Sequence, residues 1–153
     1  MPGPLEGRLA LVTGASRGLG AATAAALARL GADLVITART VGGLEETDDA
    51  IRAAGRHASL VPLDLKDGGA VDMLGPSIAQ RFHRLDVLVH CAAVLGPLTP
   101  AGHIMPAAWA EVMDVNLAAA WRLIRTTAPL LVAAPAGRAV FVTDARARAP
   151  RAY

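Results

Sequence analysis

The sequence predicts an α/β fold in which a doubly wound parallel sheet has strand order 3-2-1-4-5 and helices on both faces. Short apolar runs alternate with segments of helical periodicity along the chain, which is the order of βαβ units. The runs are continuously apolar, as strands are when helices cover both faces of a parallel sheet. Right-handed crossovers between such strands then give this strand order.

The expected strands lie at residues 9–12, 34–37, 60–63, 87–89 and 139–142. The last run is apolar on both faces, which favours an interior strand over a sheet edge. We therefore expect a further element to pack beside this strand.

Helices are predicted where apolar residues recur at helical spacing. One such stripe consists of Leu19, Thr23, Ala26, Leu27 and Leu30, and another of Val71, Leu74, Ile78 and Phe82. Gly75 and Pro76 interrupt the second stripe, so we expect a kink or a restart of the helix there. A long helix is expected over residues 109–134.

Composition and charge indicate a single domain over residues 1–153. A hydrophobic content of 54% excludes general disorder, and a net charge of +2 gives no reason to expect nucleic acid. The apolar stretch 117–134 carries Arg122 and Arg125 near its middle, which argues against a membrane span. The lone Cys91 and the four histidines lack disulfide or metal-ligand spacing, so we expect a cytoplasmic protein without a metal.

A glycine-rich segment joins the first strand to the first helix. Gly14, Gly18 and Gly20 follow the apolar run and open the helical pattern. Glycines let the backbone turn tightly beside a pyrophosphate, whose charge is favoured by the free N–H groups at a helix N-terminus. The spacing is G-x-x-x-G-x-G rather than G-x-G-x-x-G, and no G-K-[ST] follows, which disfavours a P-loop NTPase. The segment predicts a phosphate-binding loop.

Residues 13–20 resemble the cofactor loop of the short-chain dehydrogenase/reductase family, and later segments follow in that family's order. Leu63-Asp64-Leu65 resembles its adenine-binding acidic segment. His90-Cys91-Ala92-Ala93 stands where the family usually has Asn-Asn-Ala-Gly, and Asp114-Val115-Asn116-Leu117 resembles its helix motif. The resemblance implies a Rossmann-type dinucleotide-binding domain and an oxidoreductase. Such an enzyme transfers hydride between a nicotinamide and a small-molecule carbonyl or secondary alcohol. The resemblance further implies that this chain is the N-terminal portion of a longer protein with additional strands, which in its complete form would be a homo-oligomer.

The resemblance also implies where the cofactor is held. The phosphate cradle would consist of Gly14, Ser16, Arg17, Gly18, Leu19 and Gly20. Further contacts are implied at Asp64, Leu65, His90, Cys91, Ala92 and Ala93. Because His90 and Cys91 replace two asparagines, the side-chain hydrogen bonds that brace the family's neighbouring strands cannot all remain.

Cofactor preference is implied by the residues that follow the second strand. Family members that prefer NAD carry an acid at the position of Ala38, and an acid would repel the additional phosphate of NADP. Here Arg39 and Arg17 offer two guanidinium groups suited to phosphate. The resemblance therefore implies that NADP(H) is preferred and that NAD(H) is possible.

The catalytic residues of the family are incomplete in this chain. Asn116 matches the Asn that holds a water in the proton relay, and Asp144 falls where the family has its Ser. An ionised carboxylate can only accept a hydrogen bond where the Ser would donate one. Tyr153 is either the catalytic Tyr or a loop Tyr ahead of the motif, and the chain's lysine, Lys66, lies at the adenine end. We expect the chain to be inactive alone.

The sequence is compatible with three functions. The first is an NADP-dependent oxidoreductase of the short-chain dehydrogenase/reductase type. The second is a non-catalytic NADP-binding module, a degenerate relative that lacks the Ser, Tyr and Lys. The third, a methyltransferase that uses S-adenosylmethionine, is disfavoured because Arg39 occupies the place where an acid would bind a ribose.

Overall fold

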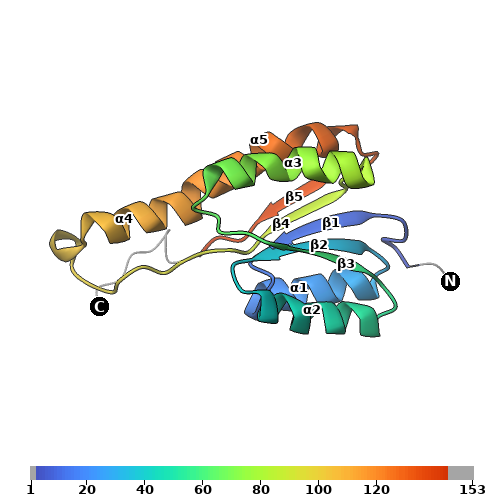
Figure 1. Ribbon diagram of the computed structural model, residues 1–153, viewed down its shortest axis with the longest axis horizontal. Coiled ribbons are helices and arrows are strands. Elements are labelled where there is room, and N and C mark those ends of the chain that lie inside the picture. The colour runs from blue at the N-terminus through green and yellow to red at the C-terminus, as the bar shows by residue number, and fades with distance from the viewer. Residues whose placement is uncertain (1–2, 145–153) are drawn as a thin grey trace.

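A parallel sheet forms the centre of the molecule (Figure 1). The computed structural model describes residues 3–144. The strand order is β3-β2-β1-β4-β5, which confirms the predicted topology. The strands are β1 (Leu9–Thr13), β2 (Asp33–Ala38), β3 (Ala58–Pro62), β4 (Val87–His90) and β5 (Arg138–Phe141).

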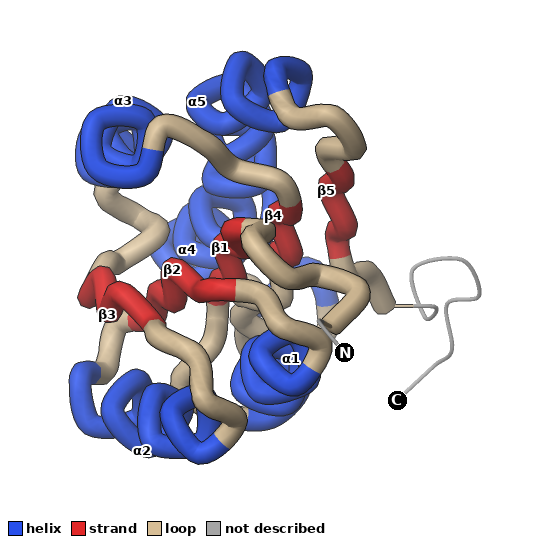
Figure 2. Tube along the Cα trace, turned by 90° about the vertical axis from the view of Figure 1, so that its right-hand side faces the viewer, coloured by secondary structure: helices blue, strands red, loops and turns tan. Residues whose placement is uncertain are grey.

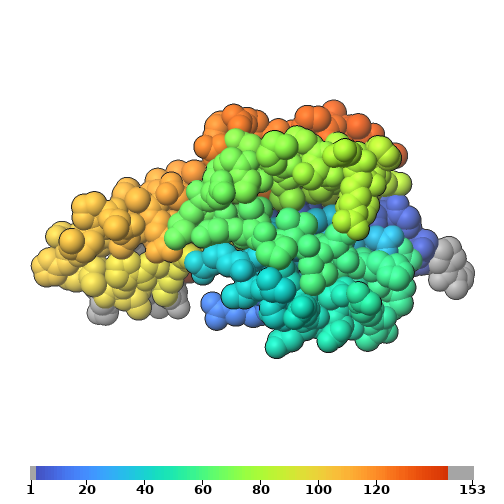
Figure 3. Space-filling model, viewed as in Figure 1, coloured from blue at the N-terminus to red at the C-terminus, as the bar shows by residue number. Residues whose placement is uncertain are grey.

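Helices cover both faces of the sheet (Figure 2). One face carries α1 (Gly18–Arg29) and α2 (Val41–Ala53), and the other carries α3 (Gly68–Phe82) and α5 (Ala119–Ala133). A short 3-10 turn, η1 (Ala101–His103), precedes α4 (Pro106–Met113). The α4 segment projects beyond the rest of the surface in the space-filling view (Figure 3).

The long helix expected over residues 109–134 is interrupted by a π-helical turn. This turn, η2 (Asp114–Ala118), lies between α4 and α5. Periodicity alone does not distinguish such a turn from the helix on either side. A π turn inside an α-helix is frequently found at a functional site, and this one contains Asn116.

Two apolar layers hold the helices to the sheet. Leu9 and Leu11 of β1 belong to the cluster that includes residues of α3 and α5. Ala10 and Val12 belong to the cluster that includes residues of α1 and α2. Successive residues of a strand point to opposite faces, so a strand packed on both sides reads as one continuous apolar run. This is the pattern that the sequence shows.

The expected restart at Gly75-Pro76 does not occur, because α3 continues as one helix through Pro76. Proline has no backbone N–H, so the Asp72 carbonyl loses its intrahelical donor. The Thr126 hydroxyl of α5 donates to that carbonyl at 2.7 Å. A hydrogen bond from a distant segment therefore replaces the one that proline removes.

β5 forms an edge of the sheet within the described residues, whereas its sequence favoured an interior position. β5 pairs with β4, and no described strand pairs with its other side. Arg138, Ala139 and Val140 are exposed as a result, with Val140 retaining 51% of its accessible surface. The apolar character of this strand is therefore not matched by burial in the described part of the chain.

A buried carboxylate ties the amino end of β1 to the loop that leads into β4. Asp86 accepts hydrogen bonds from the Leu9 N–H, from Arg8 at 2.8 Å and from Arg84 at 2.7 and 2.8 Å. Burial opposes ionisation of Asp86, but the hydrogen bonds from Arg84, Leu9 and Arg8 outweigh it and lower the pKa to about 2.

We expect Asp86 to make the protein acid-sensitive. The pKa of Asp86 is about 2 in the folded state against 3.8 ordinarily. Its stabilisation is therefore fully present above the unfolded-state pKa and is lost as the pH falls through the folded-state pKa. The difference corresponds to about 2 kcal/mol. Urea unfolding at neutral and at acidic pH measures it, and Asp86→Asn should lose correspondingly less stability on acidification. An equal loss in both proteins contradicts the prediction.

Candidate functional site

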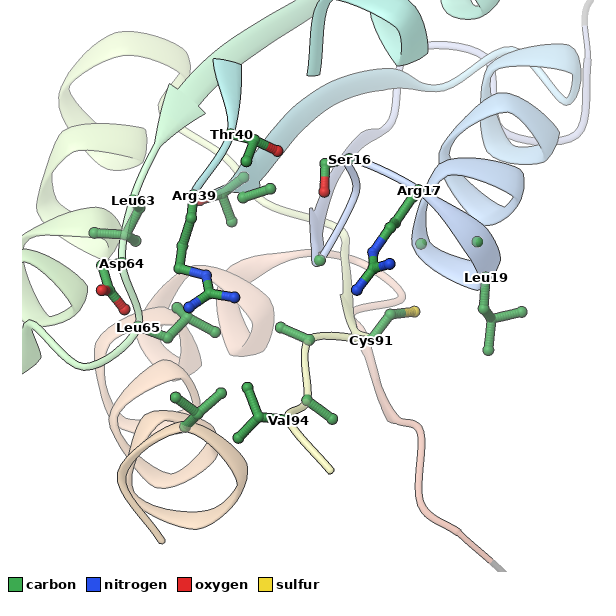
Figure 4. A pocket seen from close by; sticks show the side chains of 18 residues that line it. Ser16, Arg17, Leu19, Arg39, Thr40, Leu63, Asp64, Leu65, Cys91 and Val94 are labelled. Atoms are coloured by element: carbon green, nitrogen blue, oxygen red, sulfur yellow. The ribbon is translucent and has the colours of Figure 1, made fainter. Parts of the chain in front are cut away.

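The carboxyl ends of β1, β2 and β4 meet the N-terminus of α1 around a pocket of about 470 Å³ (Figure 4). Every cofactor-binding residue expected from the sequence lines this pocket except His90. Thr37, Ala38, Thr40, Leu63, Val94 and Val115 complete the lining. Residues from five separate segments of the sequence are thus brought together at one edge of the sheet, around the switch between β1 and β4.

The glycine loop is close-packed, and this explains its composition. Gly14 has a φ of +67°, and a Cβ there would lie 2.8 Å from the N and Cα of Ala92. A Cβ on Gly20 would lie 2.1 Å from the Gly14 carbonyl oxygen. Gly18 has open space around it, but its φ of +57° lies in the left-handed region that favours glycine.

The start of α2 supports this loop from behind. The buried Thr47 hydroxyl donates to the Ala15 carbonyl at 2.7 Å. A Cβ on Gly43 would lie 2.7 Å from Ser16, so glycine permits the close approach of α2. Sequence reasoning missed both residues. The available signals were a glycine inside a helix and a hydroxyl on the buried face of that helix.

The N-terminus of α1 opens onto the pocket. Arg17 occupies the N-cap position without a side-chain cap, and the first turn contains no acidic residue. The first N–H groups of a helix have no partner within the helix. Together with the positive end of the helix dipole, they favour an anion at this position.

Two arginines give the pocket a positive lining. Figure 4 shows Arg17 and Arg39 directed into the pocket, from the start of α1 and from the segment after β2. Within residues 3–144, neither guanidinium forms an ion pair. Ala38, which precedes Arg39, supplies no carboxylate that would neutralise this charge.

Asp64 brings an acidic group to the β3 side of the pocket (Figure 4). Its Oδ1 accepts the Lys66 backbone N–H at 3.0 Å, which fixes the turn after β3. The Lys66 Nζ lies 4.0 Å from Asp64 Oδ2 and 3.7 Å from Glu111 Oε1. These surface ion pairs contribute little to stability, and the Asp64 side chain keeps 43% of its accessible surface beside the pocket.

The residues after β4 form another wall of the pocket. Cys91, Ala92 and Ala93 line it. Burial raises the pKa of the Cys91 thiol, and the Thr23 side chain partly opposes this, so the thiol stays protonated at neutral pH. His90 differs from the expectation of a cofactor contact. It is buried behind the lining, where burial lowers its pKa and keeps the imidazole neutral.

Asn116 ties η2 to the chain that follows β4. Its Oδ1 accepts the Val94 N–H at 2.8 Å, and its Nδ2 donates to the Val94 carbonyl at 2.8 Å. Asn116 does not itself line the pocket, although its neighbour Val115 does. The amide is therefore engaged with another backbone segment.

Asp144, another catalytic candidate, is not brought to the pocket. Asp144 is exposed, follows β5 by three residues and is not part of the pocket lining. Tyr153 lies outside the described residues.

Among the residues from 3 to 144, no group of three or more His, Cys, Asp or Glu side chains could hold a metal ion. No helix in this same range is long and apolar enough to cross a membrane.

Comparisons with known proteins agree with this geometry. Residues 8–152 match the sequence profile of the short chain dehydrogenases. An uncharacterised NAD-dependent oxidoreductase of Mycobacterium tuberculosis is 35% identical over 95% of this chain and 57% of its own length. The uncharacterised oxidoreductase YciK of Escherichia coli is 34% identical over 97% of this chain and 60% of its own. The chain thus spans less than two thirds of either relative.

Solved structures show the same arrangement. YciK from Escherichia coli superposes with a TM-score of 0.91 at 34% identity, over 99% of this chain and 64% of that structure. A metagenomic short-chain oxidoreductase in complex with NADP superposes with a TM-score of 0.92 at 38% identity. That match covers 97% of this chain and 67% of the other.

Proposed function

The chain belongs to the short chain dehydrogenase family, and on that basis we propose that its pocket binds NADP(H) in preference to NAD(H). The proposed reaction is hydride transfer between the nicotinamide and a small-molecule carbonyl or secondary alcohol. The observation that carries the cofactor proposal is the pair of guanidinium groups, Arg17 and Arg39, directed into a pocket where Ala38 supplies no acid. The NADP complex of a similar structure supports it.

The residues present fit a dinucleotide. The open space beside Gly18 and the uncapped N-terminus of α1 suit a pyrophosphate. Asp64 and Leu65 would receive the adenine, and the segment from Cys91 to Ala93 would contact a ribose. When bound, the nicotinamide supplies the hydride acceptor or donor.

Arg17 and Arg39 would discriminate between the two cofactors. The additional phosphate of NADP lies on the adenosine ribose, so it would be held at the end of β2. A guanidinium can donate two hydrogen bonds to one phosphate. The adenosine ribose of NAD offers the two guanidinium groups only hydroxyls. Hydroxyls compensate the desolvation of these charged groups less well than a phosphate does.

We expect NADPH to bind more tightly than NADH by about 1.5–3 kcal/mol, the range for a hydrogen bond to a charged group. Arg39→Asp should reverse the order of the two dissociation constants, because the new carboxylate repels phosphate and accepts from ribose hydroxyls. Titration followed by nicotinamide fluorescence measures both values. Arg29→Asp is the matched control, because Arg29 lies in the last turn of α1 and outside the pocket. Equal dissociation constants for the two cofactors in the unmodified protein would exclude the proposed preference.

A non-catalytic NADP-binding module remains the second candidate function, and Asp144 is the residue that favours it. An ionised carboxylate at the position expected for Ser accepts hydrogen bonds and would repel the oxygen that gains negative charge as hydride arrives. Measuring NADPH oxidation with a panel of ketones and aldehydes separates the two candidates. Tight NADPH binding without turnover supports the module, and turnover with any carbonyl supports the enzyme.

A further inference from the structure

A short chain of hydrogen bonds crosses from β1 to β4 directly behind the pocket. Thr13 and His90 are the last residues of these two strands and are register partners. The Thr13 Oγ1 lies 2.7 Å from the His90 Nδ1, and both side chains are buried. The Ala92 N–H donates to the same hydroxyl oxygen at 3.4 Å. One hydroxyl therefore connects His90 to the pocket wall.

Which group donates in the bond between Thr13 and His90 follows from counting the protons and lone pairs of the two side chains. A threonine hydroxyl has one proton to donate and two lone pairs to accept. Its oxygen accepts from Ala92, so its proton is satisfied only if His90 Nδ1 is an acceptor. With the opposite tautomer, both the Thr13 hydroxyl proton and the His90 Nε2 lone pair would lack a partner. The neutral imidazole therefore carries its proton on Nε2, which has no hydrogen-bond partner within the described residues.

These hydrogen bonds help to fix the position of Ala92, and this position determines the shape of the pocket. Ala92 approaches the glycine loop so closely that a Cβ on Gly14 would lie 2.8 Å from its N and Cα. A small displacement of Ala92 toward the loop would meet backbone atoms, and a displacement away from it would widen the pocket. The Ala92 N–H bond to Thr13 is one of the contacts that sets this distance.

We propose that His90 is a positioning residue that acts through the Thr13 hydroxyl to hold the Cys91–Ala93 wall in place for the dinucleotide. The inference rests on the proposed function, and it differs from a direct cofactor contact because His90 does not line the pocket. The residue is also held from the side of β5. The ring centroids of His90 and Phe141 in β5 lie 5.5 Å apart, and the His90 carbonyl accepts the Val142 N–H at 3.0 Å.

Three substitutions at one position test which nitrogen matters. His90→Asn can place its amide oxygen where Nδ1 lies, His90→Gln extends its amide toward the position of Nε2, and His90→Phe keeps a ring against Phe141 without an acceptor. We expect the NADPH dissociation constant to stay within roughly twofold for Asn and to rise roughly tenfold for Gln and Phe, the scale of one buried hydrogen bond. Equal weakening by all three substitutions, or by none, would overturn the proposal.

A double-mutant cycle tests whether His90 acts through Thr13. Thr13→Val removes the hydroxyl and keeps the shape, and Thr13→Ser restores a hydroxyl. In His90→Phe combined with Thr13→Val, the affinity should be no weaker than in the worse single variant, because both changes break one path. Additive losses would contradict this path. Thermal unfolding of each variant separates loss of fold from loss of affinity, and Thr13→Ser and His90→Asn keep the test valid if the others fail to fold.

A readout without any cofactor separates this inference from the proposed function. Nitrogen NMR of the free protein should show His90 protonated on Nε2 and unprotonated on Nδ1. Hydrogen exchange at the Ala92 amide should be faster in His90→Phe than in His90→Asn. A proton on Nδ1, or equal exchange in the two variants, overturns the inference. If the unmodified protein binds neither NADPH nor NADH, the proposed function fails, and these two measurements still decide the role of His90.

Discussion

A methyl group at position 20 is expected to abolish dinucleotide binding. In Gly20→Ala, the new Cβ would lie 2.1 Å from the Gly14 carbonyl oxygen and 2.6 Å from its carbon. These are backbone atoms, so rotation of a side chain cannot relieve the overlap. The glycine loop must move away from α1, and the N–H groups that would face a pyrophosphate move with it. Losing one or two hydrogen bonds to a charged phosphate, each worth about 1.5–3 kcal/mol, corresponds to a rise in the NADPH dissociation constant on the order of 100-fold, and we expect at least that rise.

Gly42→Ala is the control for this substitution. Gly42 also lies in the first turn of a helix beside the pocket, but a Cβ there meets nothing within 4 Å. We expect Gly42→Ala to bind NADPH as the unmodified protein does and to be at least as stable, because alanine is the better helix former. Circular dichroism shows whether Gly20→Ala stays folded. A folded Gly20→Ala that binds NADPH within threefold of the unmodified protein, a limit roughly equal to 0.7 kcal/mol, would show that the loop does not hold the pyrophosphate.

The fold and most of the pocket could be predicted from the sequence because both depend on local patterns. β1, β2 and β4 are covered on both sides by helices, so burial imposes a continuous apolar run on each of them. The glycine spacing reflects backbone contacts within a few residues of one another, such as that between Gly14 and Gly20. Topology then brings the ends of these strands to the same edge of the sheet.

What the sequence did not reveal depends on contacts between distant segments. The bond between Thr47 and Ala15 joins residues that are 32 positions apart, and no periodicity marks it. His90 was expected at the pocket because residues 90–93 resemble the family's Asn-Asn-Ala-Gly segment, but successive residues of a strand face opposite sides. Like Leu88, His90 therefore faces away from α1 and α2. This alternation was available in the sequence and would have placed His90 behind the pocket.

Pro76 shows the same limitation at the interface of α3 and α5. A proline after a glycine predicts a broken helix, yet α3 is continuous because Thr126, which lies 51 positions from Gly75 and 54 from Asp72, completes its hydrogen bonds. The Thr126 hydroxyl donates to the Asp72 carbonyl at 2.7 Å and accepts the Gly75 N–H at 3.2 Å. The Asp72 carboxylate meanwhile forms ion pairs with Arg122 and Arg125 of α5. The Thr126 side chain of α5 thus binds the backbone of α3 on both sides of the turn that contains Gly75.

The second large effect is therefore expected at Gly75. A Cβ there would lie 2.0 Å from the Thr126 carbonyl oxygen, so Gly75→Ala must push α3 and α5 apart and break both Thr126 hydrogen bonds. We expect a loss of about 3 kcal/mol or more in the free energy of unfolding, the upper range for overpacking, and a melting temperature lower by roughly 6–12 °C. Urea unfolding and calorimetry measure the two quantities.

Gly69→Ala separates this steric effect from the general effect of alanine in α3. A Cβ on Gly69 makes only an ordinary contact, 3.4 Å from the Asp67 side chain, and alanine favours the helix. Gly69→Ala should therefore be neutral or stabilising. Because the Thr126 backbone causes the overlap at Gly75, adding Thr126→Ala to Gly75→Ala should not restore stability. If Gly75→Ala is as stable as Gly69→Ala, or if Thr126→Ala rescues it, the close approach of the two helix backbones does not hold α3 in its continuous form.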